Sequence, residues 1–266
     1  MSVRKERRRR SSARVTGASS GVGRTFVHKF DEGRGGPRDE IWAVARSQDA
    51  LEELSKSCKN IPVRPLVLDL TDDKALDKLE QMLTEGITVQ WLVNSAGFGT
   101  FGMFGDVGRR SNAGMVRLNC LSLTEVISIV LPHTCPGSRI INLSSIAGVV
   151  PQVELATYSA SKAFVLELSR MLDHELASCG VRVMALCPKF MRTKFLNKPG
   201  DDDAARRMTR IGFEDVDRVV SKALRASLVG RPLCITSPDM RAAHVAAKLL
   251  PRRMLFLVED LLFSRI

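Results

Sequence analysis

Short apolar runs alternate with amphipathic stretches along the chain. Most runs are rich in β-branched residues, continuous rather than alternating, and bounded by Gly, Pro, Ser or Asp, as expected of parallel strands covered on both faces. The predicted strands are Ala13–Thr16, Glu40–Ala45, Pro62–Leu68, Thr88–Val93, Arg139–Leu143, Val181–Cys187 and Pro232–Thr236. The predicted helices are Gly23–Asp31, Gln48–Cys58, Asp72–Thr84, Asn112–Leu131, Ala156–Ser178 and Phe213–Leu228.

Strands that alternate with helices predict right-handed β-α-β crossovers. We therefore expect an α/β fold with a doubly wound parallel sheet of about seven strands, arranged as a three-layer α/β/α sandwich. The first strand is the weakest element. The stretch Arg8–Arg14 brings charge to a place where burial is costly, so only Ala13 to Val15 suit a buried strand.

The 266 residues include 40 Lys and Arg and 29 Asp and Glu, a formal net charge of +11. Such a surplus suggests a nucleic-acid or anionic-membrane partner. It lies mainly at the ends, because residues 1–14 and residues 222–253 each hold seven basic side chains and one acidic. With two Trp and one Tyr, the chain also has few platforms for base stacking. We therefore expect no nucleic-acid partner.

Six dispersed cysteines, none in a C-x-x-C pair, indicate buried thiols in a reducing compartment rather than a disulfide framework or a metal site. The basic start does not lead into an apolar stretch, so no signal peptide is expected. No eighteen-residue window is apolar and free of charge, so no membrane span is expected either. Together these features predict a cytoplasmic protein.

A glycine-rich turn follows the first predicted strand and opens a helix. Gly17, Gly21 and Gly23, with Ser19, Ser20 and Val22 between them, would let a pyrophosphate approach the backbone amides at the helix N-terminus. The same residues also read G-x-S-x-G around Ser19, the nucleophile elbow of α/β-hydrolases. That elbow needs several preceding strands and a late histidine. Only His244 lies late, in an amphipathic stretch. The dinucleotide interpretation is therefore favoured.

A second group of residues carries acid–base chemistry. Tyr158 and Lys162 are four residues apart, so both side chains lie on one face of a helix. A nearby ammonium would stabilise the phenolate and lower the pKa of Tyr158 towards the range of a general acid. Ser145, at the end of a strand, is placed to hydrogen-bond a carbonyl oxygen as negative charge develops on it.

From about residue 13 to residue 236 the chain resembles the single-domain branch of the short-chain dehydrogenase/reductase family. The matching motifs are T-G-x3-G-x-G at Thr16–Gly23, Asn94-Ser95-Ala96-Gly97, Asn119, Ser145, and Y-x3-K at Tyr158 and Lys162. The resemblance implies a Rossmann-type NAD(P)-binding catalytic domain over residues 13–240. Before it we expect a disordered basic arm (residues 1–12), and after it an amphipathic extension (residues 241–266). We also expect a homodimer or homotetramer.

The resemblance also implies roles for individual residues. Tyr158 would give or take the proton, Lys162 would bind the nicotinamide ribose and tune the tyrosine, and Ser145 would orient the carbonyl. Asn119 would hold a water in the proton relay. The expected cofactor contacts are Gly17, Ser19, Ser20, Gly21, Val22, Gly23, Arg46, Asp69, Asn94, Tyr158, Lys162 and Thr193. For Asp69, the alternative is a helix-capping turn only.

Two positions depart from the family pattern inside the site. Ser95 replaces the second Asn of N-N-A-G, which weakens one stabilising hydrogen bond. Lys189 follows Pro188 where the family usually has glycine, which restricts the backbone beside the nicotinamide and makes the position of Thr193 less certain.

The end of the second predicted strand bears on the choice of cofactor. NAD users place an acidic residue there for the ribose 2′-hydroxyl, whereas this chain has Ala45 and Arg46. A guanidinium suits a 2′-phosphate, and Arg24 would add charge, so NADPH is predicted over NADH.

Apolar residues at Phe98–Phe104, Val149–Val153, Lys189–Met191 and Phe195–Leu196 suggest a pocket for a lipid-, steroid- or aromatic-like ketone or alcohol, or else part of the core. Residues 241–266 read as two amphipathic helices broken at Pro251, which would pack on the core or a subunit, touch an anionic membrane, or cover the site. The predicted function is NADP(H)-dependent interconversion of a carbonyl and an alcohol. The alternative is a non-catalytic protein that senses NADP(H) or binds nucleic acid or membrane.

Overall fold

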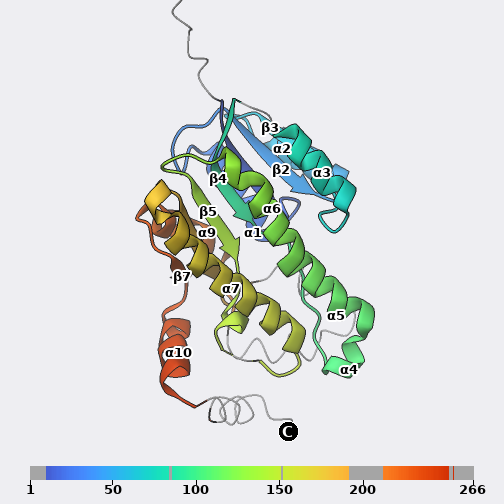
Figure 1. Cartoon of the computed structure of the whole chain (residues 1–266), viewed down its shortest axis with the longest axis vertical. Coiled ribbons are helices and arrows are strands. Elements are labelled where there is room, and N and C mark those ends of the chain that lie inside the picture. Colours follow the sequence, from blue (N-terminus) through green and yellow to red (C-terminus); the bar gives the residue numbers. More distant parts are fainter. Residues whose placement is uncertain (1–9, 84–85, 151, 192–211, 252–253, 255–266) are drawn as a thin grey trace, which may run out of the picture.

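The computed structural model describes residues 10–83, 86–150, 152–191, 212–251 and 254, and within them it contains one parallel sheet of seven strands. The strands are β1 (Arg10–Thr16), β2 (Glu40–Ala45), β3 (Val63–Val67), β4 (Ile87–Asn94), β5 (Arg139–Leu143), β6 (Arg182–Cys187) and β7 (Leu233–Ile235). Their order is β3-β2-β1-β4-β5-β6-β7, so β2 and β3 lie on one side of β1 and β4 to β7 lie on the other. The predicted doubly wound α/β fold is confirmed (Figure 1).

Helices cover both faces of this sheet. They are α1 (Gly21–Asp31), α2 (Gln48–Ser57), α3 (Asp73–Met82), α4 (Phe104–Val107), α5 (Arg109–Val116), α6 (Leu123–Val130), α7 (Ala156–Leu176), α9 (Val216–Leu228) and α10 (Pro238–Leu249), with a π-helical turn η1 (Arg117–Ser122) between α5 and α6. Short 3-10 turns are η2 (Leu131–His133), η3 (Ile146–Gly148) and η4 (Ala177–Cys179). Apolar side chains of α1, α2 and α9 form one core against the sheet, and those of α3, α6 and α7 form the other. This is the expected three-layer sandwich.

The first strand is longer than predicted. It begins at Arg10, three residues before the predicted start, and so includes Ser11 and Ser12 of the predicted arm. The strand tolerates these polar residues because Ser12 Oγ donates to the Thr88 carbonyl at 3.0 Å, and the buried Arg14 guanidinium stacks on Trp42 at 3.4 Å from the ring centroid. Burial lowers the pKa of Arg14 to about 9. Residues 1–9 of the arm lie outside the described residues.

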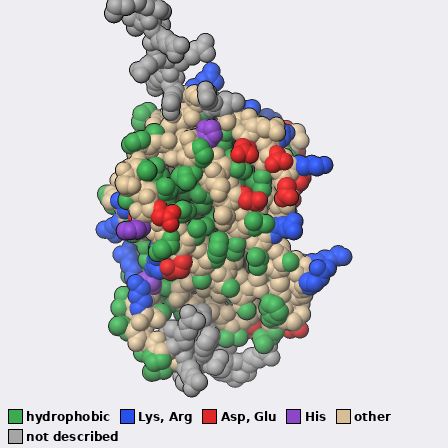
Figure 2. Space-filling model, in the orientation of Figure 1, with side chains coloured by type: hydrophobic (Ala, Val, Ile, Leu, Met, Phe, Trp, Pro, Cys, Tyr) green, Lys and Arg blue, Asp and Glu red, His purple; other side chains and the backbone are tan. Residues whose placement is uncertain are grey.

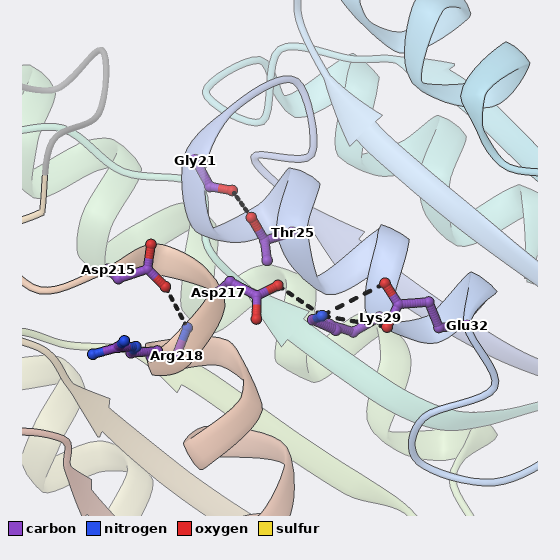
Figure 3. Close-up of polar contacts among 7 residues, drawn as sticks. All are labelled: Gly21, Thr25, Lys29, Glu32, Asp215, Asp217 and Arg218. Carbon is purple, nitrogen blue, oxygen red and sulfur yellow. Dashed lines mark hydrogen bonds and ion pairs between the residues drawn. The ribbon is translucent and has the colours of Figure 1, made fainter.

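Helix α9 is anchored to α1 by charge. Lys29 Nζ lies 2.7 Å from Asp217 Oδ1 of α9 and 3.3 Å from Glu32 Oε2 of its own helix (Figure 3). The helix itself begins after Asp215, whose Oδ1 accepts the Arg218 backbone N–H at 2.9 Å. The predicted start at Phe213 is therefore three residues early, because the capping carboxylate marks the first turn.

The C-terminal end of the described chain is weakly packed. Helix α10 begins at Pro238, three residues before the predicted extension, and none of its residues is fully buried. Its Val245 and Leu249 are exposed. Some of the basic side chains in this region form hydrogen bonds within the fold. Lys222 Nζ donates to the Thr236 carbonyl, and Arg241 Nε donates to the Ile235 carbonyl. The second predicted helix, beyond Pro251, lies outside the described residues.

One stretch, Arg109–His133, is long and apolar enough to cross a membrane, with a mean hydropathy of 1.5 over its best window. This stretch contains Arg117 and Glu125, so the observation that no eighteen-residue window is both apolar and free of charge still holds. Length and composition alone are weak evidence for a span, and apolar side chains of α6 within this stretch pack in the core against the sheet. On the face seen in Figure 2, acidic side chains gather at the upper right, where Figure 1 places α2 and α3.

Candidate active site

A cavity of about 740 Å³ opens along the carboxyl edge of the sheet, across the ends of β1 to β6. Ligands of doubly wound sheets bind at this edge, where the strand order reverses. Ten of the residues predicted for the site line the cavity: Gly17, Ser19, Ser20, Gly21, Val22, Arg46, Asp69, Ser145, Tyr158 and Lys162. Gly23, Asn94 and Asn119 are not among the lining residues, and Thr193 lies outside the described residues.

The glycine-rich turn is built so that its backbone faces the cavity. Gly17 and Gly21 have φ values of +65° and +52°, which side chains rarely adopt. A Cβ on Gly23 would lie 2.4 Å from the Gly17 carbonyl oxygen, so this glycine permits close packing inside the turn rather than ligand contact. Thr16 Oγ1 accepts the backbone N–H groups of Ser95 and Ala96, both at 3.1 Å, and so ties the turn to the loop after β4.

Tyr158, Ser145 and Lys162 lie together at the β5 end of the cavity. Tyr158 and Ser145 share a side-chain hydrogen bond, and both side chains are nearly buried. Lys162 Nζ donates to the Leu143 carbonyl at 2.7 Å and lies 5.7 Å from the centroid of the Tyr158 ring. A Cβ on Gly148 would lie 2.6 Å from the Lys162 carbonyl, so the 3-10 turn after Ser145 packs directly on α7. The three groups are held rigidly within one small region.

The predicted lowering of the Tyr158 pKa is wrong in this structure. Burial raises it to about 12, against the lowering effect of the Ser145 hydrogen bond. Burial also lowers the pKa of Lys162 to about 8. The physical reason is that desolvation disfavours the charged form of both groups, while the ammonium is directed at the Leu143 carbonyl rather than at the phenol.

The buried ammonium of Lys162 predicts a pH-dependent stability. Its folded pKa of about 8 is below the unfolded value of 10.5, so the cost is fully present below pH 8 and disappears as pH rises to 10.5. In cofactor-free protein, Lys162→Met should therefore raise Tm by about a few degrees at pH 7 and by less at pH 9.5. Thermal unfolding at the two pH values measures this. If the Tm difference between Lys162→Met and the wild type were the same at both pH values, the lowered pKa of Lys162 would be contradicted.

Asn119 positions the loop after β4 rather than facing the cavity. From the π-helical turn it donates to the Phe98 carbonyl at 2.9 Å and to Ser161 Oγ at 3.0 Å, and it accepts the Phe98 N–H at 3.0 Å. Gly97 permits this approach, because a Cβ there would lie 2.9 Å from Asn119 Oδ1 and 3.4 Å from Lys162 Nζ. The role of Asn119 in a proton relay stays a prediction.

The Asn94 side chain lies beneath the cavity, and its predicted contact with a cofactor stays a prediction. This side chain is buried within the sheet, where its Nδ2 donates to Asn142 Oδ1 at 2.9 Å. The residues that follow, Ser95 and Ala96, line the cavity instead. Asn94 therefore links β4 to β5 beneath the site.

The other end of the cavity, beside β2 and β3, carries Arg46 and Asp69. The Arg46 side chain is 77% exposed, and its Nη1 lies 4.0 Å from Asp69 Oδ2. Asp69 Oδ1 accepts both the N–H and the hydroxyl of Thr71, so this residue lines the cavity and also builds the turn before α3. Arg24, expected to add charge here, is instead paired with Glu53 at 2.7 Å.

The wall of the cavity beyond β6 consists of Pro188–Met191. Lys189 fits there without a positive φ, so the expected restriction from losing glycine does not strain the backbone. Its Nζ lies 2.5 Å from Asp239 Oδ2 of α10. Several further lining residues were not predicted, among them Thr71, Gly114, Arg117 and Leu118. The position of Arg117 and Leu118 just before Asn119 was the available signal.

Apolar side chains surround the tyrosine. Met115, Ala147, Leu155 and Tyr158 form one buried cluster, against which Phe98, Phe101 and Val107 pack. Part of the predicted apolar stretch Phe98–Phe104 thus belongs to a small core beside the reactive groups, while Met103 and Phe104 are exposed. Among the described residues no cluster of His, Cys, Asp or Glu could hold a metal ion.

A family model described as short chain dehydrogenase matches residues 11–204. The chain is 33% identical over 196 residues to a very-long-chain 3-oxoacyl-CoA reductase of Rattus norvegicus, covering 70% of this chain and 61% of that protein. It therefore spans less than two thirds of this relative's length. It is 33% identical over 221 residues to sulfoacetaldehyde reductase 2 of Chromohalobacter salexigens, covering 77% and 85%.

Two solved structures share the fold. A short-chain dehydrogenase from Sphingobium yanoikuyae in complex with NADPH is 28% identical, with a TM-score of 0.78 over 96% of this chain and 98% of that chain. A short-chain dehydrogenase/reductase from Burkholderia phymatum in complex with NAD is 21% identical, with a TM-score of 0.78 over 90% and 92%, and is informative about the fold alone.

Proposed function

The chain belongs to the short-chain dehydrogenase family, and from this premise we propose that it is an NADP(H)-dependent oxidoreductase that interconverts a ketone or aldehyde with an alcohol. The observation that carries the proposal is the position of Tyr158, Ser145 and Lys162 in the same cavity as the glycine-rich turn. The direct test is NADPH oxidation with a panel of hydrophobic ketones, set beside the same panel with NADH.

The residues of the cavity fit a nicotinamide dinucleotide. The backbone of the Gly17–Gly21 turn and the N-terminus of α1 suit the pyrophosphate, and Lys162, which lines the same cavity, would bind the nicotinamide ribose. When bound, the cofactor supplies or accepts a hydride at C4 of its nicotinamide. The chain's own residues do the rest. The Ser145 hydroxyl orients the carbonyl oxygen, and the Tyr158 hydroxyl gives it a proton during reduction.

We assign the cofactor preference to Arg46. Its guanidinium is exposed at the β2 end of the cavity, where no acidic side chain follows Ala45 to bind a ribose 2′-hydroxyl. Its Nη1 lies 4.0 Å from Asp69 Oδ2, and its other donors are left for a 2′-phosphate. One related structure contains NAD and another contains NADPH, so the proposed preference for NADPH depends on Arg46.

Arg46→Ala should raise KM for NADPH about tenfold and leave KM for NADH within about twofold, because a charge-assisted bond to phosphate is lost in one case only. Steady-state kinetics with both cofactors measure the effect. Arg24→Ala is the matched control, since Arg24 is already paired with Glu53 and should change neither value. Equal loss for both cofactors, or a wild-type preference for NADH, would overturn the assignment.

We propose an apolar substrate of lipid-, steroid- or aromatic-like type. The Tyr158 ring packs with Met115, Ala147 and Leu155, and Phe98 of the same cluster lines the cavity, so an apolar group would fit beside the reacting carbonyl. The names of the two relatives give chemically different substrates, a very-long-chain 3-oxoacyl-CoA in one case and sulfoacetaldehyde in the other. The proposal therefore depends on the cluster and not on the relatives.

The remaining features are proposed in the same way. We place a single catalytic domain over residues 13–240, with a homodimer or homotetramer as the working assembly. All six cysteines are free, which supports a reducing compartment such as the cytoplasm. Contact of the C-terminal extension with an anionic membrane is a secondary proposal. Its exposed Val245 and Leu249 are the residues to substitute in a vesicle-binding assay.

A further inference from the structure

Glu214 joins the cavity wall to the segment after β7. Its Oε2 accepts the backbone N–H of Lys189, in the cavity wall, at 2.9 Å. The same oxygen accepts the hydroxyl of Thr236, which lies just after β7. The Glu214 backbone N–H donates to the Phe190 carbonyl at 2.8 Å, and Glu214 also forms a parallel bridge with Met191. Glu214, which precedes α9, thus contacts three consecutive residues of the wall, Lys189, Phe190 and Met191.

Lys189 makes a second connection from the same wall. Its side chain is only 10% exposed, and its Nζ lies 2.5 Å from Asp239 Oδ2 in the first turn of α10. The Lys189 ammonium in turn lowers the pKa of Asp239. A glycine at position 189 would lack this contact. The substitution that departs from the family pattern therefore attaches the cavity wall to the C-terminal helix.

This wall stands beside the reactive residues. The Pro188 carbonyl accepts the Ile146 N–H at 3.1 Å, immediately after Ser145, and the Leu186 carbonyl accepts the Ser144 N–H at 2.8 Å. Because β6 pairs with β5 in register up to Leu143 and Leu186, the wall continues the same layer as the serine. It lies at the end of the cavity opposite Arg46, which follows β2.

We propose that Glu214 and Lys189 form a clamp that positions the wall Pro188–Met191 against the nicotinamide end of the cofactor. Both are positioning residues, since they act through the wall. The inference rests on the proposed NADP(H) function. It predicts that the clamp contributes to the nicotinamide half of the cofactor site and not to the half around Arg46. A general structural role would affect both halves alike.

The test compares two ligands. NADP⁺ carries the nicotinamide, whereas 2′-phospho-ADP-ribose has the same adenine and phosphates without it. Glu214→Ala should raise Kd for NADP⁺ about tenfold by calorimetry and leave Kd for 2′-phospho-ADP-ribose within about twofold, because the Lys189 N–H in the wall and the Thr236 hydroxyl after β7 both lose their acceptor. Turnover, where a substrate is in hand, should fall by a similar factor.

Two variants provide the controls. Glu214→Gln keeps a neutral acceptor at the same place and should restore most of the NADP⁺ affinity. Asp215→Ala removes the neighbouring cap of α9 (Figure 3) without touching the wall, so it should lower Tm and leave both Kd values unchanged.

The outcomes separate the clamp from the proposed function. If the ratio of the two Kd values is the same in Glu214→Ala as in the wild type, or if Asp215→Ala changes it equally, the clamp is wrong. If the wild-type protein binds neither ligand, the NADP(H) function itself fails.

Discussion

Tyr158→Phe is expected to lower kcat for carbonyl reduction by about 10²–10⁴-fold, the usual contribution of a positioned general acid. The substitution removes only the hydroxyl that is hydrogen-bonded with Ser145, while the ring keeps its contacts with Met115 and Leu155. KM for NADPH should therefore change by about twofold at most. Initial rates of NADPH oxidation measure both values, and circular dichroism checks that the fold is retained.

A second measurement concerns the phenol itself. Tyr158 is the only tyrosine of the chain, so near-ultraviolet phenolate absorbance reports on this group alone. Burial raises its pKa to about 12 in the cofactor-free protein, so the phenol is protonated and able to donate at neutral pH. We expect the positively charged nicotinamide of NADP⁺ to decrease this pKa. Titration with and without NADP⁺ should show that decrease. Equal activity of Tyr158→Phe and the wild type would remove the tyrosine from the mechanism.

Sequence patterns predicted the fold well because they depend on local burial. Continuous apolar strands such as Glu40–Ala45 and Arg139–Leu143 have the predicted bounds, since each is covered on both faces and flanked by loop residues. The start of β1 was not predicted, because the patterns depend on local burial alone. Its polar residues are accommodated by partners 28 to 76 positions away, Trp42 and Thr88, which a local pattern does not contain.

The site was predictable where a motif specifies backbone shape or side-chain spacing. Gly17, Tyr158 and Lys162 line the cavity because a tight turn and a four-residue helical spacing determine their positions. The place of the Asn94 side chain was not predictable, because its motif gives no direction for the side chain, which is bonded to Asn142 beneath the site. The partners of Lys189, Glu214 and Asp239, lie 25 and 50 residues further along the chain, and only the folded structure brings them together.

Arg14→Met is expected to raise the free energy of unfolding by about 1–3 kcal/mol, or Tm by several degrees. Arg14 is 2% exposed in the middle of β1. Its Nη1 reaches only the Ala13 carbonyl at 3.4 Å, and its Nε and Nη2 are buried without a hydrogen-bond partner in the described structure. Stacking on Trp42 offsets up to about 2 kcal/mol of the desolvation cost. Methionine has a similar length, packs on the same ring, and carries no charge into the core.

Chemical denaturation at pH 7 measures the increase in the free energy of unfolding, and two variants identify its source. Arg14→Lys keeps a buried charge and should not be stabilising, whereas Arg64→Met removes the exposed guanidinium 4.8 Å from the same Trp42 ring and should have little effect. The folded pKa of Arg14, about 9, is below its unfolded value of 12.5. The cost of burying the charge is therefore complete below pH 9, so the gain from methionine should be constant between pH 6 and 8 and shrink above pH 9. Unchanged or reduced stability of Arg14→Met would mean that the stacked guanidinium has compensated its own desolvation.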